Sequence, residues 1–185
     1  MGLHAPGRSV VISPDDRLAV AWQLGREPRD IIDIAHRCPC GQPDVVITSP
    51  RLSDGTPFPT VYYLTCPRAA SAVGRLEGGG VMREMEHRLA DDPELAAAYA
   101  EAHIDYLDAR NAHGDVPEIE GVSAGGMPDR VKCLHVLLAH SLAAGPGVNP
   151  LGDETRALVG EWWAGHSCAV ARAEGEAACA EEEGA

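Results

Sequence analysis

Residues 127–142 carry apolar side chains at helical spacing on nearly all sides. Asp129 can cap the start of this helix after Pro128, and Gly145 with Pro146 stops it. A helix that is apolar nearly all round is usually buried, so we expect this one at the centre of the fold. At about 100° per residue, its main face carries Val131, Leu134, Leu138 and Leu142, and its flanks carry Val136 and Leu137.

Three β-rich stretches predict strands at residues 30–37, 45–48 and 60–65. The pattern of the first stretch fits a helix as well as a strand. We favour a strand because a tight Cys-Pro-Cys-Gly turn follows it and a second β-rich run comes next. Since the links between the three stretches are short, we expect an antiparallel meander.

Capping and stop signals predict five further helices. The first begins at Ser13-Pro14 and ends at Gly25, with Leu18, Ala21, Trp22 and Leu24 on its apolar side. The others are a helix opened by Cys66-Pro67 and closed by glycines 78–80, helices over 81–90 and 94–112, and one that starts at Asp153 and runs past Trp162 and Trp163. The sequence therefore predicts an α+β fold: a small three-stranded antiparallel sheet packed by several helices around a buried central helix.

Composition predicts one globular domain over residues 13–170. Residues 1–12 are expected to form a flexible arm. Residues 171–185 are rich in alanine and glutamate and predict a disordered acidic tail.

The chain is strongly acidic, with a formal net charge of −13. This charge argues against a nucleic-acid or anionic-membrane partner. No stretch approaches the roughly 20 apolar residues of a membrane span, and the N-terminus lacks a signal-peptide pattern. A cytoplasmic location is therefore expected, where thiols stay reduced, so the six cysteines are read as packing, metal-binding or reactive groups rather than as disulfides.

Several of these cysteines lie where a metal site can form. Cys38-Pro39-Cys40-Gly41 occupies the first predicted hairpin turn, and a glycine after the second cysteine can free backbone N–H groups to face the sulfurs, as in zinc knuckles. The single residue between the cysteines is shorter than the usual knuckle spacing. Cys66 ends the third predicted strand, so the meander can bring it to the same region.

The central helix offers Cys133, His135 and His140 as further ligands. Cys133 and His140 lie two turns apart, about 10.5 Å along the axis, so one ion can hardly bind both. Cys133 with His135 requires a distorted first turn. We therefore predict a tetrahedral zinc site formed by Cys38, Cys40, Cys66 and one of those three helix residues. Simple packing is the alternative, because free cysteines and hydrogen-bonded histidines are common in cores. Cys168 and Cys179, near the tail, are interpreted as incidental.

A thiol-dependent enzyme is the second hypothesis. Cys66 precedes Pro67 at a helix start and has Arg68 beside it, a setting that lowers a thiol pKa and can create a nucleophile. His135 or His140 is the candidate base. The non-catalytic interpretation is that Cys66 only caps the helix.

An anion-binding loop is the third hypothesis. Ser123-Ala124-Gly125-Gly126 precedes a helix start with Arg130 and Lys132, which resembles a generic phosphate cradle. It lacks the P-loop pattern, and Asp129 would repel a phosphate. A flexible linker is the competing interpretation.

Several unusual strings also occur together in one order: CPCGQPDVV, DGTPFPTVYYLTCPR, RLEGGGVMREM, and SAGGMPDRVKCLHVLLAHSLA with GVNPLGD. On these strings, residues 13–158 resemble an uncharacterised bacterial family, common in actinobacteria and catalogued as a domain of unknown function. The resemblance implies genes that neighbour those for septum-formation-initiator-like and exopolyphosphatase proteins, and it identifies no catalytic residues. It also implies that some members lack the cysteine at position 40, which would favour Cys38, Cys66, Cys133 and a histidine as ligands.

Taken together, the sequence predicts a cytoplasmic protein in which a structural metal, expected to be zinc, joins the sheet to the central helix. Its expected task is binding or regulation through a protein partner.

Overall fold

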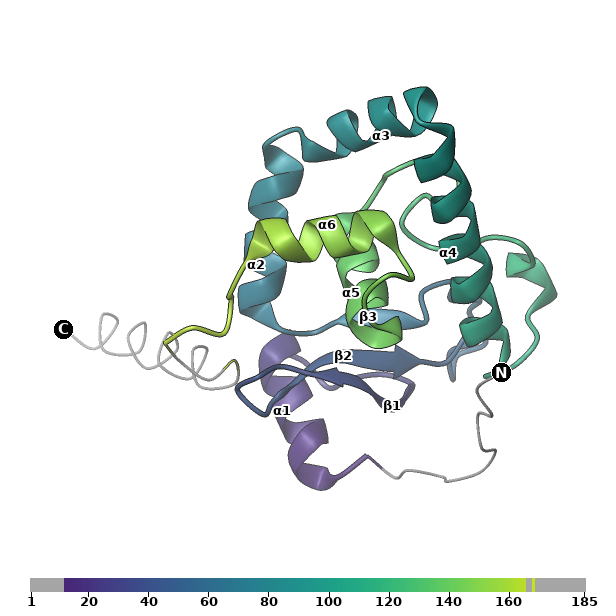
Figure 1. Cartoon of the computed structure of the whole chain (residues 1–185). Coiled ribbons are helices and arrows are strands. Elements are labelled where there is room, and N and C mark those ends of the chain that lie inside the picture. Colours follow the sequence, from purple (N-terminus) through teal and green to yellow (C-terminus); the bar gives the residue numbers. More distant parts are fainter. Residues whose placement is uncertain (1–11, 166–167, 169–185) are drawn as a thin grey trace.

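The computed structural model describes residues 12–165 and residue 168 (Figure 1). The arm predicted for residues 1–12 lies almost entirely outside these residues, and the tail predicted for residues 171–185, with Cys179, lies wholly outside them. The strands are β1 (Ile31–Arg37), β2 (Pro43–Thr48) and β3 (Tyr62–Leu64). The helices are α1 (Pro14–Leu24), α2 (Pro67–Gly78), α3 (Val81–Asp91), α4 (Pro93–Asn111), α5 (Leu134–Ala144) and α6 (Pro150–Val159), with a short 3-10 helix, η1 (Pro117–Ile119).

The predicted α+β architecture is confirmed. The three strands form one antiparallel sheet in the order β1-β2-β3, in which β2 pairs with both neighbours. The central strand is buried along most of its length. The hairpin turn that carries Cys38 and Cys40 is therefore attached to a buried strand.

The central helix α5 is buried as predicted, between the sheet and the other helices (Figure 1). It packs against α6, against the sheet through β3, and against α2. The core that it organises is aliphatic and tyrosine-rich. Its fully buried members include Leu134, Leu137, Leu138, Leu151, Tyr99, Tyr106 and Met85.

The predicted start of the central helix is wrong. Residues 129–133 are not helical, and α5 begins only at Leu134. The loop in front of α5 binds this stretch: Arg130 N–H donates to the Gly126 carbonyl, and Lys132 N–H donates to the Gly125 carbonyl. Cys133 is therefore an extended residue in front of the helix.

Two further expectations need correction. In α1 the Ser13 cap and the Gly25 stop are confirmed, but Leu18 and Trp22 are exposed, and the buried residues are Val20 and Gln23. The last helix starts earlier than predicted, because the Asn149 side chain accepts from Gly152 N–H and caps it, and it ends at Val159. The two tryptophans, Trp162 and Trp163, follow it outside the helix.

Of the helices in the described part of the chain, none is long and apolar enough to cross a membrane.

Candidate metal centre

The turn between β1 and β2 places two cysteines side by side. Cys38 N–H donates to the Gln42 carbonyl at 2.9 Å and Gly41 N–H donates to the Cys38 carbonyl at 2.8 Å, so the turn is closed at both ends. Gly41 has φ of 87°, a left-handed conformation that side chains disfavour. This glycine therefore lets the chain reverse directly after Cys40.

The other two cysteines come from distant segments. Cys66 is the residue before α2 and is fully buried. Cys168 belongs to the segment after α6, which the buried Trp162 anchors in the core. The Arg68 guanidinium also donates to the Ala164 carbonyl at 2.8 Å, which ties this segment to the first turn of α2.

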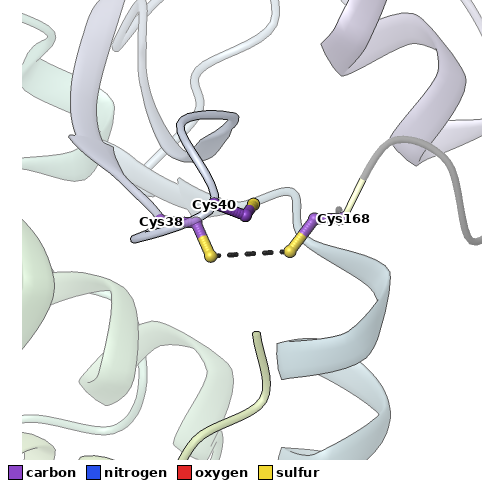
Figure 2. Close-up of side chains that lie close together, drawn as sticks. All are labelled: Cys38, Cys40 and Cys168. Carbon is purple, nitrogen blue, oxygen red and sulfur yellow. Dashed lines mark hydrogen bonds between the residues drawn. The ribbon is translucent and has the colours of Figure 1, made fainter. Parts of the chain in front are cut away.

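These four cysteines, here called the sulfur cluster (Cys38, Cys40, Cys66 and Cys168), lie together. The sulfurs of Cys38, Cys40 and Cys168 are all within 4.8 Å of one another. Those of Cys38 and Cys168 point toward each other at 3.6 Å (Figure 2). The Cys66 thiol in turn interacts with the thiol of Cys168 through a side-chain hydrogen bond. Sulfurs bound to one tetrahedral zinc ion are about 3.8 Å apart, so this spacing suits a metal.

The surroundings of the sulfur cluster favour thiolates at two positions. Burial raises the pKa of Cys40, but the backbone N–H groups of Cys168 and Gln42 face its sulfur and lower the pKa overall. The Cys168 thiol and, against the effect of burial, the N–H groups of Arg68 and Ala69 lower the pKa of Cys66. Such N–H groups stabilise negative sulfur and are a common outer shell of metal-bound thiolates.

The other two cysteines favour the neutral thiol in the absence of an ion. Burial raises the pKa of Cys38 to about 11, since taking charge out of water is costly. The neighbouring thiol of Cys66, followed by burial, raises the pKa of Cys168. A divalent cation would reverse both effects, because its charge stabilises thiolates directly.

A second group of possible ligands lies elsewhere. Glu77, Cys133 and His135, here called the Glu–Cys–His group, offer an oxygen, a sulfur and a nitrogen within 4.8 Å of one another. The sequence singled out Cys133 and His135 but as ligands of the first site. Cys133 precedes α5 in extended form, which removes the geometric objection to using it together with His135. Glu77, in the last turn of α2, carries no sequence signal that distinguishes it from other helix acids.

The third candidate on the central helix, His140, lies in neither group. It is fully buried, and both of its ring nitrogens have protein partners. Nε2 lies 2.8 Å from the Asp105 carboxylate, and Nδ1 lies 3.2 Å from the Asn149 amide nitrogen. Because the amide nitrogen can only donate, Nδ1 is the acceptor, and His140 is the neutral tautomer with its proton on Nε2.

The groups of the predicted anion-binding loop make contacts within the protein instead. The Ser123 hydroxyl lies 3.0 Å from His103 Nδ1 and donates to the Met127 carbonyl at 3.1 Å. A Cβ on Gly126 would lie 2.6 Å from the carbonyl oxygen of Arg130, so the glycine permits close packing of the loop upon itself. These contacts favour a structural role for the loop over a phosphate cradle.

The rival nucleophile, Cys66, has no described histidine as a hydrogen-bond partner. His135 contacts Glu77, Cys133 and the Ala70 carbonyl, and His140 contacts Asp105 and Asn149. The cysteine that sequence reasoning missed is Cys168. Its distance of 130 residues from Cys38 gives no local spacing to recognise, and only the total of six cysteines hinted that more ligands were available.

A family model matches most of this chain. Neither the curated proteins nor the solved structures contain a match to this chain. A family model described as "Protein of unknown function (DUF501)" matches residues 34–157. The matched range contains Cys38, Cys40, Cys66 and the whole Glu–Cys–His group, whereas Cys168 lies beyond it. With about two thirds of its length matched, the chain belongs to this family of proteins of unknown function.

Proposed function

We propose that this protein is a zinc-stabilised binding module in which one ion is held by Cys38, Cys40, Cys66 and Cys168. The observation that carries the proposal is the convergence of these four thiols, three of them buried, from a hairpin turn, a helix start and the C-terminal segment. Tetrahedral sites made only of cysteine are typical of structural zinc.

A site of this kind does no chemistry itself. Four protein ligands fill the tetrahedral shell of the ion and leave no position for water or substrate. The ion would instead join the hairpin, α2 and the C-terminal segment. The domain would then act by binding, with a protein partner as the sequence predicts.

The thiol-enzyme alternative receives less support. Cys66 is fully buried, and a nucleophile must reach its substrate. Its lowered pKa is explained equally by a role as a metal ligand, since the same N–H groups stabilise a thiolate in either setting.

The test is a metal count on the full-length protein, purified from zinc-supplemented cells and dialysed. We expect Cys40→Ser and Cys168→Ser each to lower the zinc content by about one equivalent relative to the wild type. Cys179→Ser is the matched control and should leave the zinc content unchanged. Equal zinc in wild type and both cluster variants would overturn the proposal.

A measurement on the wild type alone guards against variants that do not fold. With cobalt(II) in place of zinc, we expect the intense sulfur-to-cobalt charge-transfer absorption of a site with four thiolates. An absorption corresponding to a single thiolate, or none, contradicts the proposed ligand set.

A further inference from the structure

The Glu–Cys–His group lies where two helices meet. Glu77 is in the last turn of α2, Cys133 directly precedes α5, and His135 is the second residue of α5. Glu77 Oε1 accepts from Leu134 N–H at 2.7 Å, so the carboxylate is fixed at the start of α5, close to the two other side chains. All three residues are partly accessible, whereas three of the four cysteines of the sulfur cluster are buried.

The orientation of His135 is that of a metal ligand. Its Nε2 donates to the Ala70 carbonyl at 3.1 Å, which puts the proton on Nε2 and leaves the lone pair of Nδ1 free in the neutral ring. Nδ1 faces Glu77 Oε1 at 3.2 Å and Cys133 Sγ at 3.9 Å. Histidines that bind metals usually donate their second N–H to a carbonyl or carboxylate in this way.

A cavity opens next to this group. It has a volume of about 270 Å³ and is lined by Cys133 and His135 together with Thr60, Tyr62, Tyr63, Leu64 and Val136. The lining combines apolar side chains with hydroxyl groups, a composition common in small-molecule sites. Two of the three possible ligands therefore face space that a small molecule could enter.

We propose that Glu77, Cys133 and His135 bind a second divalent transition-metal ion whose fourth coordination position opens into this cavity and takes a small ligand with an anionic oxygen or nitrogen donor. Nitrogen, sulfur and oxygen donors together suit zinc and iron(II), while magnesium and calcium prefer oxygen alone. Three protein ligands with one exchangeable position are the arrangement of catalytic rather than structural metal sites.

An ordinary ion pair is the competing explanation. A protonated His135 beside Glu77 would account for the 3.2 Å contact without an ion. A protonated Nδ1 could also donate to the Cys133 sulfur at 3.9 Å, but the ion pair gives no role to the cavity beside the group. The two explanations differ in whether cobalt binds.

The experiment titrates the metal-free full-length protein with cobalt(II) and counts the bound ions. We expect two equivalents in the wild type and one in Glu77→Gln and in His135→Gln. Glu77→Gln keeps an oxygen that can accept from Leu134 N–H, so it should fold normally. Glu101→Gln and His87→Gln, on exposed positions of α4 and α3, are the matched controls and should bind two.

Failure of this inference can be told apart from failure of the sulfur cluster. If only the second site exists, the wild type binds one ion that His135→Gln loses and Cys168→Ser keeps. If Glu77→Gln and His135→Gln bind as many ions as the wild type, the Glu–Cys–His site is overturned and the ion pair explains the contact.

The exchangeable coordination position of the Glu–Cys–His site can be tested separately with azide. Azide should shift the cobalt absorption of the wild type, because a small anion can replace the ligand in the exchangeable position. The shift should be absent from His135→Gln, in which only the closed site remains. No shift with the wild type, at an azide concentration that saturates known open sites, would overturn the open coordination position.

Discussion

At the scale of single residues, the most consequential polar group outside the metal sites is His140. The ring stacks on Tyr62 with centroids 5.8 Å apart and meets Tyr106 edge-on at 5.1 Å. Its two hydrogen bonds require the neutral form, because Nδ1 accepts from the Asn149 amide. Burial lowers the pKa of His140, although the Asp105 carboxylate opposes the shift.

We predict that His140 makes the free energy of unfolding depend on pH. In the unfolded chain this histidine takes up a proton near its ordinary pKa of 6.5, whereas the folded chain resists protonation. The stability it contributes is present above pH 6.5 and is lost as pH falls toward the lowered pKa, at up to about 1.4 kcal/mol per pH unit.

Urea unfolding of wild type and His140→Gln at several pH values between 5 and 8 checks this prediction. The variant should be less stable at pH 7.5 by about 1–3 kcal/mol, and the difference should shrink at low pH. His87→Gln, on an exposed position, should reproduce the wild-type dependence. A gap that widens on acidification contradicts the assignment.

At the scale of elements, local sequence signals placed most helices and all three strands, but they misplaced the start of the central helix. The apolar spacing continues through Val131, so the pattern alone predicts a longer helix. Its start is decided by tertiary contacts: Val131 N–H donates to Glu86 on α3, and Leu134 N–H donates to Glu77 on α2. Neither contact changes the spacing of apolar residues, so the sequence pattern does not reveal it.

The exposed apolar side of α1 shows a similar limit. Periodicity indicated that the helix is amphipathic, but its buried residues are Val20 and Gln23, and the Gln23 amide donates to the Pro43 carbonyl at 2.7 Å. A long-range hydrogen bond of this kind can orient a short helix, and no local rule predicts it.

The hairpin turn of the sulfur cluster allows a matched pair of substitutions. Gly41→Ala adds a Cβ with no atom within 4 Å, so its cost comes from the left-handed backbone alone and should be about 1–2 kcal/mol. Gly74→Ala, in the exposed middle of α2, also meets nothing within 4 Å and should instead stabilise the protein by roughly 0.5–1 kcal/mol.

Thermal unfolding of both variants measures these opposite effects. Zinc affinity provides a second readout, because a distorted turn displaces Cys38 and Cys40 whereas a change in α2 does not. We expect Gly41→Ala to bind zinc more weakly and Gly74→Ala to match the wild type. Equal zinc affinity for all three proteins would argue that the turn does not hold the ion.

At the scale of the whole molecule, the sequence singled out three of the four cysteines of the sulfur cluster and missed the fourth, Cys168. The hairpin turn, Cys38, Cys40 and Cys66 follow from turn and cap signals, and the fold brings them together as the meander implied. The position of Cys168 depends on the packing of Trp162 and on the Arg68 contact to Ala164. Such contacts between distant segments form only in the finished fold.

Removal of the metal should destabilise the whole domain. A bound ion stabilises the folded state by about 3 kcal/mol when its free concentration is 100 times the Kd, which corresponds to roughly 6–12 °C in Tm for a chain of this size. We therefore expect a strong chelator to lower the Tm of the zinc-loaded wild type. The Cys40→Ser/Cys168→Ser double variant should respond less, because only an ion at the Glu–Cys–His group could remain in it, and a chelator effect of equal size in that variant would contradict a structural ion in the sulfur cluster.

The contact between Cys38 and Cys168 joins residues that are 130 positions apart. An ion bound there would join the two ends of a loop that contains most of the folded chain. In the zinc form, the first hairpin and the segment after α6 would therefore unfold as one unit. Amide exchange should show this as a shared opening free energy for residues 38–42 and 160–165 in the zinc form. After chelation those two regions should exchange faster, with different opening free energies, while α5 remains protected.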